Sequence, residues 1–122
     1  MPGNPPPVTV YGIASCDSVK KSRAWLTELG IGYQLHDFKK QGLTPELLDP
    51  WLAQAGWERL LNRKGTTWRR LDDATRAAVT GARAARSLML AQPSLVKRPV
   101  VEWSGSLTVG YDPLRWAALA GQ

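Results

Sequence analysis

The first 38 residues restrict the possible fold more than any other part of the chain. Residues 7–12 read PVTVYG, a β-branched and aromatic run bounded by Pro and Gly that predicts a strand. Apolar residues at helical spacing follow over 17–29, and residues 33–38, YQLHDF, predict a second strand. Two strands joined by a helix pair in parallel, because only a crossover connection returns the chain beside the first strand. The chain therefore begins as a β-α-β unit, with Cys16 in the loop before the helix.

A helical segment follows the second strand. Thr44 followed by Pro45 is a typical helix start, with an apolar stripe at helical spacing after it. Pro50 leaves two possibilities open, a kink in this helix or a restart. The other helical stretches are residues 57–62 and 72–92, with breaks at 64–68 and at Gly81. We expect an all-helical insert over about residues 43–92.

The last part of the chain returns to strands. Residues 100–103 and 107–110 flank Ser-Gly-Ser, which predicts a hairpin, and Asp112 followed by Pro113 can open a closing helix over 112–119. The expected order is β-α-β, helical insert, β-β-α, an α/β fold with a mixed four-stranded sheet. We expect one domain over residues 7–122, preceded by a disordered tail over residues 1–6.

The cysteine count limits the chemistry. One cysteine in 122 residues excludes an internal disulfide, a four-cysteine zinc site and a dithiol redox pair within the chain. With one cysteine and one histidine, His36, there is no metal constellation, so we expect no metal and no tightly bound cofactor. His36 lies in the second predicted strand, which favours a structural role. No membrane-length apolar run or targeting segment is apparent, and we expect a cytoplasmic monomer with no membrane partner.

Positive charge is concentrated in the second half of the chain. Residues 59–98 contain ten Lys and Arg residues and two Asp residues, a local charge of +8 within a net charge of +6. Such a segment can attract nucleic acid, an acidic protein or a small oxyanion. The basic residues come singly or in pairs and no nucleic-acid fingerprint accompanies them, which disfavours nucleic acid. Solvated helix faces account for most of these residues.

Cys16 is the strongest candidate for a reactive group. It stands between two small polar residues, Ser15 and Asp17, at the predicted strand-to-helix turn, a poor position for an inert core cysteine. A helix start stabilises a thiolate through its partial positive charge, and Lys20 lies one turn further on. We therefore expect Cys16 to be a nucleophile.

Three segments in order resemble the ArsC-like arsenate reductase family, and most closely its YffB-type branch, whose members are described as glutathione-dependent thiol reductases. They are GIASCDSVKKSR at 12–23, LLNRKGTTWR at 60–69 and KRPVVEW at 97–103, and the resemblance covers about residues 8–119. It implies a thioredoxin-like fold, a nucleophilic Cys16 and a cis peptide bond before Pro99. It also implies that Arg63 and Arg98 converge on the cysteine to hold an oxyanion or a carboxylate. We expect Ser15, Lys20 and the backbone at Pro99 to contribute to the same substrate or glutathione site.

The resemblance implies a function and leaves alternatives. A third family arginine is missing, since residues 107–111 read LTVGY, which puts arsenate in doubt as the substrate. We expect a glutathione-dependent thiol reductase, in which Cys16 attacks an oxidised thiol or an oxyanion and glutathione, the co-substrate, or a glutaredoxin-like reductant resolves the adduct. The alternatives are a genuine arsenate reductase and an Spx-like regulator that binds RNA polymerase. Many Spx-type proteins carry Cys-x-x-Cys, whereas this chain has Val19 at the second position.

Overall fold

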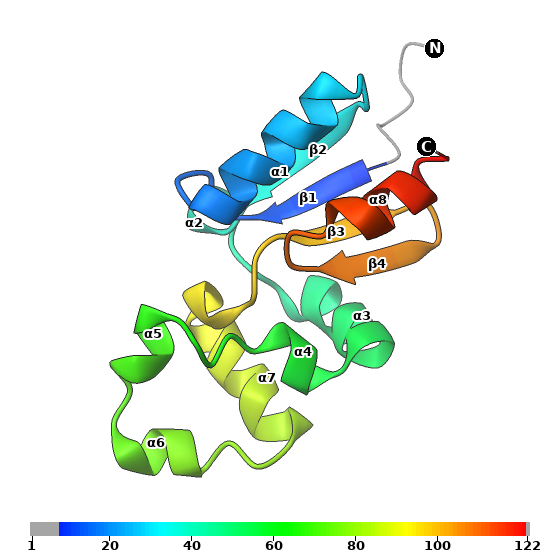
Figure 1. Ribbon diagram of the computed structural model, residues 1–122. Helices are drawn as coiled ribbons and strands as arrows, with labels where there is room; N and C mark the ends of the chain where they lie inside the picture. Colours follow the sequence, from blue (N-terminus) through cyan, green and yellow to red (C-terminus); the bar gives the residue numbers. More distant parts are fainter. Residues whose placement is uncertain (1–7, 122) are drawn as a thin grey trace. The chain divides into compact units, whose positions relative to one another are not determined.

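The computed structural model describes residues 8–121, so the tail predicted over residues 1–6 lies outside the described residues. The chain divides into two compact units. The first contains the chain up to Gln41 and again from Arg98, and the second is Gly42–Lys97. The blue and red ends of the chain in Figure 1 build the first unit, and the green and yellow middle builds the second. The predicted helical insert, 43–92, falls inside the second unit.

The first unit is built on a four-stranded sheet of order β2-β1-β3-β4. The strands are β1 (Val8–Gly12), β2 (Tyr33–Asp37), β3 (Val100–Trp103) and β4 (Ser106–Val109). β1 and β2 are parallel and the other two pairs are antiparallel, which confirms the predicted mixed sheet. Because Val8 pairs with Tyr33 and Gly12 with Asp37, the two parallel strands end at the same edge. The loop carrying Cys16 leaves the sheet at that edge.

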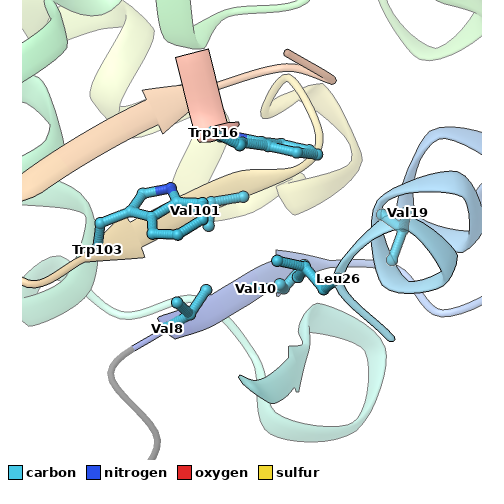
Figure 2. Packing of buried hydrophobic residues seen from close by; sticks show 7 residues of the cluster. All are labelled: Val8, Val10, Val19, Leu26, Val101, Trp103 and Trp116. Carbon is cyan, nitrogen blue, oxygen red and sulfur yellow. The ribbon is translucent and has the colours of Figure 1, made fainter. Parts of the chain in front are cut away.

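Helices α1 (Asp17–Glu28) and α8 (Pro113–Leu119) pack on one face of this sheet (Figure 1). Asp112 caps α8 as expected, since its side chain accepts a hydrogen bond from the Arg115 amide. Figure 2 shows the shared core, in which side chains from α1, α8, β1 and β3 meet. Its buried members are Val8, Val10, Val19, Leu26, Val101, Trp103 and Trp116. The core fixes the start of α1 against β1, and with it the position of Cys16.

The second unit is entirely helical. It contains α3 (Pro45–Ala55), α4 (Trp57–Leu60), α5 (Thr66–Arg69), α6 (Asp73–Ala77), α7 (Ala82–Ala91) and a 3-10 turn, η1 (Pro93–Leu95). Thr44 caps α3 through its side chain, as predicted, and α3 continues through Pro50, so the helix does not restart there. Among residues 8–121, no helix is both long and apolar enough to cross a bilayer.

Several element boundaries differ from the prediction; β4, for example, is Ser106–Val109 and not 107–110. Phe38, predicted as the last strand residue, begins the short helix α2 (Phe38–Gln41), because Asp37 accepts a hydrogen bond from the Lys39 amide and caps it. Residues 64–68, predicted as a break, contain the start of α5. The helical stretch predicted over 57–62 ends at Leu60, because Leu61 forms a β-bridge with Val96.

Candidate functional site

Cys16 is the N-cap residue of α1, in extended backbone conformation with φ −72° and ψ 133°. Its amide donates to the carbonyl of Ile13 at 2.9 Å, and its own carbonyl accepts from the Lys20 amide at 2.9 Å. The side chain is half-buried against the core and makes no capping hydrogen bond to the first turn. The thiol therefore lies at the positive end of the α1 dipole and is not committed to capping the helix.

Arg98 lies beside the end of β1, from which the Cys16 loop leaves. A Cβ atom added at Gly12 would lie 3.7 Å from both Cβ and Cγ of Arg98, so the stem of this arginine packs over the glycine. Arg98 is half-buried, while the adjacent Pro99 is buried. The structure thus brings Arg98 to the same end of the sheet as Cys16, although 82 residues separate them in the sequence.

Pro99 is held by the sheet. The Arg98–Pro99 peptide bond is cis, as the resemblance implies. The Pro99 carbonyl accepts a hydrogen bond from the Gly110 amide at 2.8 Å, so this oxygen already has a partner in the first unit.

Ser15 precedes the cysteine in the sequence and Lys20 follows it. Ser15 belongs to the turn before α1, and Lys20 stands in the first turn of the helix. Both are exposed, as is Asp17. One predicted set of site residues therefore belongs to a single unit and to one end of its sheet: Ser15, Cys16, Lys20, Arg98 and Pro99.

Arg63 belongs to the helical unit. Its guanidinium lies over the Trp57 ring, 5.5 Å from the centroid, a cation-π contact that the sequence did not reveal. It borders a cavity of about 160 Å³ that three more basic residues also line, namely Arg59, Lys64 and Lys97, together with Glu58. This cavity is suited to an anion by its charge, and the approach of Arg63 to Cys16 stays a prediction.

Sequence analysis missed Asp37. This carboxylate is buried, with 7% of the residue exposed, and it reaches the Cys16 loop, where it accepts a hydrogen bond from the Ala14 amide at 3.4 Å. An acidic residue at the end of a parallel strand, next to the strand that leads to the cysteine, was the available signal. Reading residues 33–38 as one strand concealed it, because Asp37 then appeared to be an interior strand position.

His36 is packed among rings. Its imidazole lies 5.1 Å from the Tyr11 ring and 6.0 Å from the Phe38 ring, measured between centroids. The Tyr11 hydroxyl donates to a Glu102 carboxylate oxygen at 2.8 Å, and burial raises the pKa of Tyr11 well above its usual value. This environment supports the structural role predicted for His36. Among the described residues, no group of three or more His, Cys, Asp and Glu side chains could hold a metal ion.

Adding a methyl group at Gly12 tests the geometry of the site. In Gly12→Ala the new Cβ would lie 2.6 Å from Cγ2 of Val19, a fully buried β-branched side chain in the first turn of α1. We expect the turn to shift, with a loss of about 1–3 kcal/mol in the free energy of unfolding, measured by urea denaturation. The same shift should slow reactions of Cys16.

Gly32→Ala is the matched control for this substitution. A Cβ at Gly32 meets nothing within 4 Å, so its free energy of unfolding should stay unchanged or rise slightly. Equal effects of the two substitutions would contradict the close approach of α1 to the end of β1.

Most of the chain matches a family model and several known proteins. Residues 11–119 match the sequence model of the ArsC family. A solved YffB protein is 46% identical, with a TM-score of 0.87 over 92% of this chain and 97% of the other. A solved arsenate reductase (ArsC) related protein from Brucella melitensis is 52% identical, with a TM-score of 0.74 over 97% of both chains. A global transcriptional regulator Spx from Streptococcus pyogenes is 26% identical over 86% of this chain and 78% of its own length.

Proposed function

This chain belongs to the ArsC family, and from that premise we propose that it is a thiol oxidoreductase in which Cys16 is the nucleophile and glutathione the resolving thiol. The observation that carries the proposal is the position of Cys16, at the start of α1 and at the edge of the sheet where the stem of Arg98 packs. A thiol in such an electropositive, partly exposed place is typical of reactive rather than structural cysteines.

The reaction proceeds in two exchange steps. The Cys16 thiolate attacks the glutathionyl sulfur of a mixed disulfide, so that a new Cys16–glutathione disulfide forms and the substrate leaves as a thiolate, which takes a proton from solvent. A second glutathione, as thiolate, then attacks the glutathionyl sulfur of this adduct. Glutathione disulfide leaves, and the Cys16 thiolate is regenerated. The net reaction converts one mixed disulfide and one glutathione into a free substrate thiol and glutathione disulfide.

Positive groups assist both steps. The start of α1 carries a partial positive charge and Lys20 stands in the same first turn, so both supply positive charge at the end of the helix where Cys16 reacts. The Arg98 guanidinium offers a planar pair of donors that suits a carboxylate of glutathione. Because the cytoplasm supplies millimolar thiol reductants, a monomer in that compartment, served by glutathione or a glutaredoxin-like protein, fits this chemistry.

Arsenate reduction should be weak or absent where glutathione exchange is present. The segment after Pro99 that lacks the third family arginine forms β4 and the turn after it, and two positive groups hold a multiply charged oxyanion less well than three. Adduct formation with oxidised glutathione, followed by mass spectrometry, and arsenate turnover in a coupled assay should be measured side by side. Efficient arsenate turnover would make the chain a genuine arsenate reductase, and absence of the glutathione adduct would remove the proposed function.

An Spx-like regulator is the second candidate, because Spx proteins are among the relatives of the chain. Spx-type switching through Cys-x-x-Cys needs a thiol where Val19 stands, and Val19 is fully buried in the core of the first unit. Binding to RNA polymerase without a redox switch is tested by a pull-down with the C-terminal domain of the polymerase alpha subunit. Retention of the chain on that domain would favour the regulator.

A further inference from the structure

Asp37 stands at the end of the parallel pair β1 and β2, two strands that end side by side (Figure 1). Asp37 is the last residue of β2 and pairs with Gly12, the last residue of β1. It is one of few buried charged or polar side chains, and both of its oxygens are used. Oδ1 accepts from the Lys39 amide at 2.9 Å, and Oδ2 accepts from the Ala14 amide at 3.4 Å. One carboxylate therefore links the start of α2 to the loop that carries Cys16.

A further hydrogen bond joins the backbone of Asp37 to α2. The Asp37 amide donates to the side-chain oxygen of Gln41 at 3.0 Å, while the carboxylate caps the same short helix. These reciprocal bonds resemble a capping box at the start of α2, while the Asp37 side chain itself is held by the Lys39 and Ala14 amides. A buried, doubly anchored side chain has few alternative rotamers, so it is a rigid point of attachment for the loop.

Two hydrogen bonds hold the Ile13–Cys16 turn. Within the turn, the Cys16 amide donates to the Ile13 carbonyl at 2.9 Å. From outside the turn, Asp37 accepts from Ala14, two residues before the cysteine. The internal bond closes the turn but does not orient it on the sheet, whereas the bond to Asp37 attaches it to the end of β2.

We propose that Asp37 is a positioning residue for Cys16, which holds the Ile13–Cys16 turn so that the thiol meets a bound glutathionyl sulfur in productive geometry. The expected effect on glutathione exchange rests on the proposed function. The attachment of the loop rests on the two hydrogen bonds that the carboxylate accepts. Asp37 acts through the backbone of Ala14 and is given no contact with the substrate.

The test compares two reactions of the same thiol. Exchange with oxidised glutathione needs orientation, whereas alkylation by iodoacetamide needs little. Asp37→Asn can keep one acceptor bond but offers an N–H group to the other amide, and Asp37→Ala loses both bonds. We expect either variant to slow glutathione exchange about tenfold while alkylation changes less than threefold. Unfolding would instead expose Cys16 and raise alkylation, so the ratio of the two rates separates positioning from lost stability.

Gln41→Ala is the matched control. It removes the hydrogen bond that the Asp37 backbone amide donates to the Gln41 side chain and weakens α2, but it leaves the bond to Ala14 in place. Its ratio of exchange to alkylation should equal that of the unchanged protein. An unchanged ratio in both Asp37 variants, or an equal fall in Gln41→Ala, would overturn the proposal.

A second measurement, the hydrogen-exchange rate of the Ala14 amide monitored by NMR, does not depend on glutathione. It should accelerate in Asp37→Asn and stay unchanged in Gln41→Ala, and equal protection in all three proteins would overturn the hold of Asp37 on the loop. If the unchanged protein forms no glutathione adduct but Ala14 behaves as expected, the proposed function fails and the hold on the loop stands.

Discussion

Replacing Cys16 with serine is expected to abolish the glutathione adduct to the limit of detection by mass spectrometry. No other thiol in the 122 residues can take over the exchange, and a serine hydroxyl does not ionise near neutral pH. This separates the chain from a dithiol enzyme, in which the second cysteine can still form mixed disulfides.

The same substitution should leave the fold intact. Serine is a preferred N-cap residue, and Cys16 makes no capping hydrogen bond that serine would lose. We expect the free energy of unfolding of Cys16→Ser to stay equal or to rise by up to about 1 kcal/mol, measured by urea denaturation. A glutathione adduct that survives in this stable variant would contradict the assignment of the nucleophile.

Replacing Arg98 with alanine should have the next largest effect. In the proposed function the guanidinium supplies positive charge for the thiolate and a pair of donors for a ligand carboxylate, and its loss should cost about 1–3 kcal/mol in the exchange reaction. This corresponds to roughly a 5- to 150-fold lower rate of adduct formation. Arg98→Lys keeps the charge and much of the stem over Gly12 but loses the planar donors, so an intermediate rate is expected.

Choosing the control for Arg98 depends on the structure. Arg86 on α7 is a poor control, because its guanidinium donates to Asp49 at 2.7 Å and 3.3 Å and Arg86→Ala would also break an ion pair. Arg83 is exposed on the same helix, α7, and is the better control. Arg83→Ala should change the rate less than twofold, and equal behaviour of Arg83→Ala and Arg98→Ala would remove Arg98 from the site.

Much of the fold could be predicted because its signals are local. Thr44 with Pro45 and Asp112 with Pro113 mark two helix starts by residue type alone, and both side chains cap as expected. The parallel pairing of the first two strands follows from the helix between them, since a tight turn cannot connect parallel strands. The placement of Cys16 at the start of α1 follows from the same pattern.

The missed features depend on partners far away in the sequence or on very short elements. Arg86 pairs with Asp49 across 37 residues, and Tyr11 donates to Glu102 across 91 residues, so no local pattern indicates either contact. Helix α2 has four residues, too few for an apolar period, and it depends on the capping bonds of Asp37. The contact between Asp37 and the Ala14 amide likewise depends on where the Cys16 loop lies, which the strand pattern alone does not give.

A single half-buried thiol also determines what oxidation can do to this protein. With no second cysteine in the chain, oxidation closes no covalent loop, and the unfolded chain loses none of the freedom that a disulfide would remove. In the proposed function the oxidised protein instead carries the glutathione tripeptide, with one net negative charge, at the start of α1. Its reduced and oxidised forms thus differ by an added group on the surface and not by rigidity, so a partner could distinguish them by recognising the tripeptide itself.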